Sequence, residues 1–269
     1  MTIAPARIDE LVQSLAEARA TRVPVERTLT RDDASLDDAY AVQRALMANA
    51  AKRGGGLRGF KVGTTSDAAM ARVGIDEPLF GFLERDDAVA DGGSVDVRAL
   101  IAPRIEMELA FVTREELAAA DCDAGTALAA TAYVVPAFEI IDSRYVPGPF
   151  DVVAAVADNM STARHVLGNE RLDPRAIDLG AVTATLEKNG VEIARGTGAA
   201  VLGHPARSLA WLVRALARYG MTIPAGSVVL TGGFADAVPA AGGDWFVARF
   251  TPGGSVACTF ASSAPERPA

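Results

Sequence analysis

The chain has 269 residues, half of them hydrophobic, and carries a formal net charge of -8 at pH 7. A surplus of acidic side chains is the opposite of what a nucleic-acid surface or a polybasic membrane patch requires, so we expect neither kind of partner. The two cysteines, Cys122 and Cys258, lack the spacing of a zinc site or of a disulfide framework. No apolar run is long enough to span a membrane and no signal peptide is apparent, so the sequence predicts a cytoplasmic protein.

The first part of the chain predicts two helices. Residues 8–20 place apolar side chains at helical spacing. A second helix is expected after Ser35, because Ser35 and Asp38 have the spacing of a capping box and an apolar stripe follows them. Three glycines at 54–56 then predict a turn that ends the helical pattern. We therefore expect residues 1–58 to form an N-terminal helical region.

From residue 59 onward the pattern changes to short extended runs. These runs predict strands over 60–64, 105–112, 133–141, 182–188, 191–194, 228–231, 246–250 and 256–260. Asn189-Gly190 predicts a tight hairpin between two of them, and a helix is expected over 205–220 with His204 as a structural residue at its start. The sequence thus predicts an α+β fold in which residues 59–269 form a β-rich domain with a mixed, strongly bent sheet.

One predicted strand carries two acids. Glu106 and Glu108 alternate with apolar residues, so both carboxylates are expected on the same side of the strand. Glu139 is an isolated acid in a second apolar run. Three such carboxylates suit Mg²⁺ or Mn²⁺, which prefer oxygen ligands. Spacing alone leaves an alternative open, in which the first two acids line a solvated sheet face and Glu139 pairs with Arg104 or Arg144.

Six stretches, in order along nearly the whole chain, form one set. They are GFKVGTTS at 59–66, GIDEP at 74–78, PRIEME at 103–108, PAFEIIDSR at 136–144, ADN at 157–159 with Ser161, and GAAVLGHP at 198–205. In these stretches the chain resembles the hydratase/decarboxylase family of the fumarylacetoacetate hydrolase superfamily, whose members process 2-oxo acids in the meta-cleavage degradation of aromatic compounds. The resemblance implies a lyase with a partly barrel-like sheet that forms homo-oligomers and, in some relatives, a complex with a sister enzyme.

The resemblance also implies roles for five residues. Glu106, Glu108 and Glu139 match the family's metal ligands, which makes residues 59–269 a metal-binding catalytic domain. Lys61 matches its acid/base lysine and Ser161 a serine of the pocket, so both are predicted catalytic residues. A bound Mg²⁺ or Mn²⁺ would chelate the 2-oxo carboxylate of the substrate and serve as an electron sink.

Two lyase reactions fit this chemistry. Decarboxylation of a 2-oxo-3-enedioate, such as 4-oxalocrotonate, is favoured where water is excluded, whereas hydration of 2-hydroxypenta-2,4-dienoate (2-keto-4-pentenoate) requires a polar group to activate water. Leu79 stands where hydratases of the family have an acid, and Tyr145, Arg164 and Gly232-Gly233 also resemble the decarboxylases. We expect a decarboxylase. The alternatives are a hydratase and, second, a non-catalytic binding or partner subunit of the same fold.

The substrate is expected to contact Leu79, Arg144 and Arg164. The distal carboxylate of an enedioate requires a cation, and the candidates are Arg72, Arg144 and Arg164, among which the sequence does not choose. Asp142 and Arg144, two residues apart on one predicted strand face, are expected to form a fixed ion pair.

Overall fold

The computed structural model describes residues 3–53 and 55–262, and it begins with the two predicted helices, α1 (Pro5–Thr21) and α2 (Leu36–Lys52). The capping box of α2 is present: the backbone N–H of Asp38 donates to the Ser35 hydroxyl at 3.2 Å, and the backbone N–H of Ser35 donates to the Asp38 carboxylate at 3.0 Å. Gly54, the first of the three glycines predicted to form a turn, lies outside the described residues.

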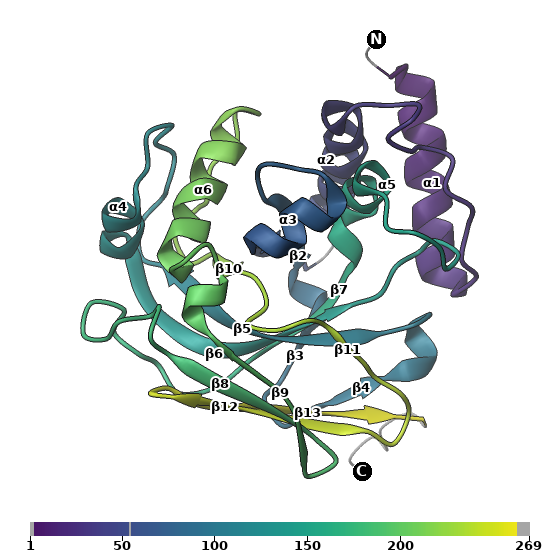
Figure 1. The fold of residues 1–269 in the computed structure, drawn as a ribbon. Coiled ribbons are helices and arrows are strands. Elements are labelled where there is room, and N and C mark those ends of the chain that lie inside the picture. Colours follow the sequence, from purple (N-terminus) through teal and green to yellow (C-terminus); the bar gives the residue numbers. More distant parts are fainter. Residues whose placement is uncertain (1–2, 54, 263–269) are drawn as a thin grey trace.

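The larger of two sheets has eight strands and curls strongly (Figure 1). In spatial order they are β2 (Leu79–Glu84), β1 (Leu57–Gly63), β10 (Val228–Leu230), β5 (Arg104–Thr113), β6 (Thr131–Ile141), β7 (Thr162–Leu167) and β3 (Ala88–Val89), with β11 (Val238–Pro239) paired to β5. The pairs β1–β10 and β3–β7 are parallel and the other pairs in this sheet are antiparallel, so the sheet is mixed, as predicted.

The smaller sheet has five strands and lies below the larger one in Figure 1. Its order is β4 (Ser94–Asp96), β13 (Gly254–Ala261), β12 (Trp245–Thr251), β8 (Thr183–Lys188) and β9 (Val191–Thr197). Strands β12 and β13 contact β6 and β13 also contacts β7, and Phe246 and Phe260 are fully buried in this region with their rings at 5.6 Å. The predicted hairpin at Asn189-Gly190 joins β8 to β9, with positive φ at both residues.

Helices lie on the opposite side of the larger sheet (Figure 1). Besides α1 and α2, the helices are α3 (Asp67–Val73), α4 (Ala124–Ala129), α5 (Val152–Ala157) and α6 (Pro205–Ala217). Short 3₁₀ turns occur elsewhere in the chain at Arg85–Asp87, Val97–Ala99, Asn159–Ser161 and Gly198–Ala200. The Nδ1 atom of His204 accepts a hydrogen bond from the backbone N–H of Ala206 at 3.1 Å, which confirms His204 as the N-cap of α6. None of the described helices combines the length and hydropathy needed to cross a bilayer.

The larger sheet curls until β2 approaches the start of β7. A Cβ atom added at Gly81 would lie 2.9 Å from Asn159 Oδ1 and 3.3 Å from Thr162 Oγ1, so this position requires the absence of a side chain. A small apolar cluster fills part of the interior: Leu83, Ala110, Val112, Val135, Ala137, Val228 and Leu230. The predicted bent, partly barrel-like sheet is confirmed. Because α1 and α2 share one buried core with the strands, the proposed boundary between 1–58 and 59–269 stays a prediction.

Candidate metal centre

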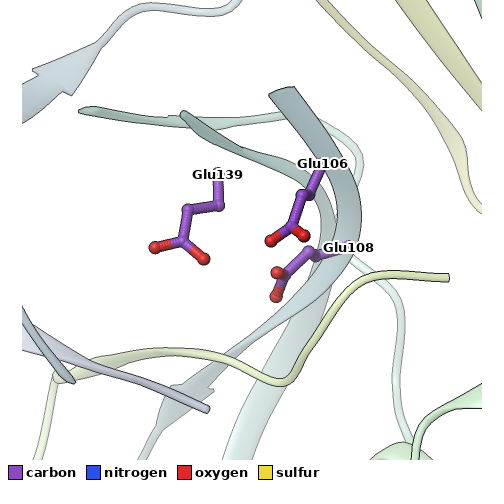
Figure 2. Close-up of side chains that lie close together, drawn as sticks. All are labelled: Glu106, Glu108 and Glu139. Carbon is purple, nitrogen blue, oxygen red and sulfur yellow. The ribbon is translucent and has the colours of Figure 1, made fainter. Parts of the chain in front are cut away.

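Strands β5 and β6 bring the three predicted acids together. Glu106 and Glu108 are two residues apart on β5, and the strand register places Glu139 of β6 directly opposite Glu106. One carboxylate oxygen from each residue lies within 4.8 Å of one from each of the others. Figure 2 shows the three carboxylates facing the same space inside the curl of the sheet. Alternation along β5 and pairing with β6 therefore suffice to build the cluster.

Burial makes this cluster electrostatically unfavourable when no cation is bound. Glu108 and Glu139 are fully buried, while Glu106 is partly exposed. Burial, followed by the charge of Glu139, raises the pKa of Glu106 to about 7. Burial and then the charges of Glu139 and Glu106 raise the pKa of Glu108 well above its ordinary value. These acids do not line a solvated sheet face, so that alternative is wrong.

The donor set fits a divalent cation. Glu108 Oε2 accepts a hydrogen bond from the backbone N–H of Gly232 at 2.7 Å, but Glu108 Oε1 is buried without a hydrogen-bond partner among the described residues. A buried acceptor without a partner destabilises a fold unless something else satisfies it. A hard cation held by three carboxylates would satisfy this oxygen and offset the repulsion between the acids.

Lys61 of β1 provides the cluster's own cation. Its Nζ atom lies 3.0 Å from Glu139 Oε2, and only 3% of its side chain is exposed. Burial lowers the pKa of Lys61, but the charges of Glu139, Glu106 and Glu108 outweigh burial, so the pKa is raised and the ammonium is protonated. Thr162 Oγ1 donates to the other Glu139 oxygen at 3.1 Å. Glu139 therefore pairs with Lys61, and not with Arg104 or Arg144.

Ser161 ends an unusual turn beside the cluster. Asn159, Met160 and Ser161 have φ values of 51°, 50° and 59°, three consecutive left-handed residues without a glycine among them. The amide side chain of Asn159 holds the turn, because its Oδ1 accepts from Phe82 N–H at 2.8 Å and its Nδ2 donates to Phe82 O at 2.9 Å. The turn places Ser161 and Met160 in the wall of a cavity.

The cavity, of about 940 Å³, opens over the acid cluster. Lys61, Glu106 and Ser161 line it, so the structure brings together one metal-ligand candidate and both predicted catalytic residues at one space. Four exposed arginines, which we call the cavity arginines, also line it: Arg31, Arg72, Arg104 and Arg195. Three of the four were not singled out from the sequence for binding an anion, because they lie in separate segments that only the fold brings together.

Arg144, a predicted substrate-binding residue, is buried away from the cavity lining. Its Nε donates to Asp158 Oδ1 at 2.5 Å, and its two Nη atoms donate to backbone carbonyls, one of them that of Asp142. The expected ion pair between Asp142 and Arg144 is wrong, because the Asp142 carboxylate accepts from the backbone N–H groups of Ile101 and Ala102. The guanidinium of Arg144 is therefore engaged within the protein.

Arg164 and Leu79 also lie outside the set of residues that line the cavity. Arg164 Nη1 donates to Asp87 Oδ1 at 2.9 Å, and the same carboxylate also forms an ion pair with Arg19. Leu79 is 1% exposed and pairs with Gly63 on β1, two residues from the pair Gly81–Lys61. Because side chains alternate along a strand, Leu79 faces the same side of the sheet as Lys61. Their substrate contacts stay predictions.

Two parts of the site carried little sequence signal. Thr162 binds Glu139, but a threonine after a turn is common in any protein. Gly232 has φ of 114° and a Cβ there would lie 2.3 Å from Thr65 Oγ1, so glycine is required where the backbone N–H reaches Glu108. The pair Gly232-Gly233 was the one visible sign of this contact.

No protein-family model matches the chain. The chain is 44% identical over 218 residues to 4-oxalocrotonate decarboxylase of Pseudomonas sp. (strain CF600), which covers 81% of this chain and 83% of the relative. It is 36% identical over 265 residues to 2-oxo-hept-4-ene-1,7-dioate hydratase of Escherichia coli, covering 96% of this chain and 97% of the relative.

Solved structures show the same likeness. A 4-oxalocrotonate decarboxylase from Pseudomonas putida G7, complexed with magnesium and adipate, superposes with a TM-score of 0.92 at 39% identity, covering 96% of this chain and 99% of that one. A fumarylpyruvate hydrolase from Pseudomonas aeruginosa shares the fold, with a TM-score of 0.58 at 13% identity over 76% of this chain and 89% of that one.

The curled sheet and its buried acid cluster thus define a protein of the fumarylacetoacetate hydrolase superfamily. Within that superfamily, the sequence identities of 44% to a decarboxylase and 36% to a hydratase, each over most of the chain, narrow the assignment to one family. The chain belongs to the hydratase/decarboxylase family, whose members named here are lyases, and the predicted family membership is confirmed.

Proposed function

We propose that the chain is a divalent-metal-dependent decarboxylase of a 2-oxo-3-enedioate such as 4-oxalocrotonate. The observation that carries the proposal is the buried cluster of Glu106, Glu108 and Glu139, with one orphaned oxygen and with Lys61 at 3.0 Å from Glu139. These three glutamates would hold Mg²⁺ or Mn²⁺. The complex of a 39% identical relative with magnesium and a dicarboxylate, adipate, supports both the metal and the substrate class.

The residues of the chain would divide the work as follows. When bound, the cation would chelate the 2-oxo carboxylate and draw electrons toward the keto oxygen. The Lys61 ammonium would give a proton to the carbon chain after the bond to the departing carboxylate breaks, because it is the buried acid that lines the cavity beside the cluster. The Ser161 hydroxyl, held in the cavity wall by the left-handed turn, would orient the substrate.

Hydration is the second candidate, and the 36% identity to a hydratase over 96% of the chain favours it. The deciding experiment offers 2-oxohex-3-enedioate and, separately, 2-hydroxypenta-2,4-dienoate with Mg²⁺, and follows CO₂ release and 4-hydroxy-2-oxo acid formation. We expect CO₂ from the first compound. Hydroxy acid without CO₂ would make the chain a hydratase, and neither product would favour a non-catalytic binding or partner subunit.

Leu79 is our reason for preferring decarboxylation. Its apolar side chain shares one side of the sheet with Lys61, so position 79 itself supplies no polar group to hold water. Replacing Leu79 by aspartate should lower CO₂ release by about 10-fold or more, because the charged side chain would recruit water to an environment whose dryness favours loss of the departing carboxylate.

The matched control for this change is Leu79→Met, which conserves the apolar character and the approximate volume and should keep most of the activity. Thermal unfolding of both variants separates loss of fold from loss of chemistry. An unchanged decarboxylation rate in well-folded Leu79→Asp would remove the argument from Leu79.

We also infer the setting in which the chain works. Both cysteines are buried and free, which suits a reducing compartment and supports a cytoplasmic location. Strand β9 is an edge strand with exposed Val191 and Ile193, which supports a homo-oligomer. A complex with a sister enzyme of the family stays a prediction.

A further inference from the structure

The charge of the cavity is opposite to that of the chain. The whole chain has 34 acidic and 26 basic residues, yet the cavity is lined by Lys61 and the four cavity arginines against two acids, Glu106 and Asp236. Since Glu106 belongs to the acid cluster at the cavity floor, the outer part of the cavity is strongly basic. Such a local field attracts anions with more than one negative charge.

Two of the cavity arginines already have partners. Arg195 forms an ion pair with Glu192 at 3.0 Å, and Arg104 Nη2 donates to the backbone carbonyl of Ala237 at 2.5 Å. An arginine whose donors are taken by the protein is less available to a ligand, because binding must first break those contacts. These two residues contribute to the field more than to a specific contact.

The other two lie at the end of α3. Arg31 Nη1 donates to the carbonyl of Val73 at 3.3 Å and so holds the last turn of the helix. The side chain of Arg72 forms no hydrogen bond or ion pair with any residue in the ranges 3–53 and 55–262, although it lines the cavity. Of the four cavity arginines, Arg72 is therefore the one with an unengaged guanidinium.

The orientation of α3 fixes where Arg72 projects. Ser66, Ala69, Arg72 and Val73 all line the cavity, which is the spacing of one helix face, while Met70 is buried in the other direction. The Ser66 hydroxyl accepts from Ala69 N–H at 3.1 Å and starts the helix. The helix is thus held at both ends. Arg72 projects toward the cavity because it lies on the face of α3 that forms part of the cavity wall.

We propose that Arg72 binds the distal carboxylate of a dioate substrate and so selects dioates over 2-oxo acids with one carboxylate, an inference that rests on the proposed function. In decarboxylation this distal carboxylate is the group that departs, as its bond to the chain breaks and the electron pair stays on the chain. A tight ion pair would stabilise the substrate and not the transition state. An exposed arginine pairs weakly in water, so Arg72 acts in capture and in specificity.

The test compares 2-oxoadipate, which has two carboxylates, with 2-oxohexanoate, which has one. Calorimetry in saturating Mg²⁺ at low salt measures both dissociation constants for the wild-type protein and for Arg72→Gln, Arg72→Lys and Arg195→Gln. We expect Arg72→Gln to raise the dissociation constant of 2-oxoadipate by about fivefold and to leave that of 2-oxohexanoate unchanged. Arg72→Lys should keep most of the affinity because it keeps the charge, and Arg195→Gln should change the ratio of the two constants little.

Turnover gives a second readout. Arg72→Gln should raise KM for 2-oxohex-3-enedioate by a similar factor and should not lower kcat, because the lost contact stabilises the bound substrate and not the transition state. The proposal would be overturned if Arg72→Gln weakened the binding of both acids equally, or if Arg195→Gln changed the ratio of the two dissociation constants as much as Arg72→Gln does. It would also be overturned if neither acid bound the wild-type protein. Binding is read without turnover, so absence of CO₂ release with an intact affinity ratio would refute the decarboxylase and leave the role of Arg72 standing.

Discussion

Replacing Glu106 by glutamine should lower metal-dependent turnover by about 10³-fold or more while the fold stays intact. Glutamine keeps the shape of the side chain but removes one of three negative charges that would hold the cation. Without metal, Glu106→Gln should be at least as stable as the wild type at pH 8, because the glutamine does not repel Glu139 and Glu108. The measurements are turnover with and without a chelator and thermal unfolding at pH 5 and pH 8.

The pH dependence follows from the direction of the shift. Folding raises the pKa of Glu106 from an ordinary value of 4.5 to about 7, so the folded metal-free protein binds more protons than the unfolded chain between these values. The contribution of Glu106 to wild-type stability should therefore fall as the pH rises from about 4.5 to about 7. Glu106→Gln should lack this part of the loss. Added Mg²⁺ should stabilise the wild type and not the variant.

Glu115→Gln is the matched control, because Glu115 is exposed and, among the residues that the structure describes, its carboxylate pairs only with the neighbouring Arg114. It should change neither turnover nor the stabilisation by Mg²⁺. Full activity of Glu106→Gln after treatment with a chelator would refute the assignment of the metal centre.

The second large effect is expected for Lys61→Met. Methionine fills a similar space but leaves the fully buried Glu139 without its cation, so the free energy of unfolding of the metal-free protein should fall by about 3 kcal/mol or more. Turnover should fall by about 10²- to 10⁴-fold, since the proton donor is lost. Urea unfolding in chelator and in Mg²⁺, together with kcat, measures both effects.

Lys61→Arg separates the two roles of the side chain. Arginine keeps the positive charge and part of the stability, but it does not release a proton in proteins and should not restore turnover. Added Mg²⁺ should recover part of the stability of Lys61→Met and none of its turnover. A Lys61→Met protein that keeps most of its turnover would show that the proton comes from another group.

The predictability of the fold depended on where each element is buried. All eight strands predicted from short extended runs are present, and β5 was the clearest because its two faces differ in polarity. Strand β2 was not predicted, because all six residues from Leu79 to Glu84 are buried and no alternation remains to be read. Strand β7 was not predicted either, because polar residues that face the interior, such as the buried His165, interrupt its apolar pattern. Helices α3, α4 and α5 are too short for a helical period.

The candidate site was predictable to the extent that it follows from one strand. Alternation placed Glu106 and Glu108 together, but only the register of β5 with β6 brings Glu139 opposite Glu106. The resemblance to a family supplied Lys61 and Ser161, whose positions in the cavity come from distant segments. Choosing among arginines for the distal carboxylate required the fold, because burial and partners distinguish them and sequence spacing does not.

The left-handed turn at Asn159, Met160 and Ser161 lowers the stability of the fold, but it also fixes the position of Ser161 in the cavity wall. Each non-glycine residue in that conformation costs on the order of 1 kcal/mol or more. The side-chain amide of Asn159 holds the turn in place through its hydrogen bonds to the backbone of Phe82 on β2. Glycine at position 160 would relieve the strain, yet it would also enlarge the conformational freedom of the segment that carries Ser161. Relieving the strain of this turn is therefore not a route to a more heat-resistant form of the enzyme that also keeps Ser161 in its present position.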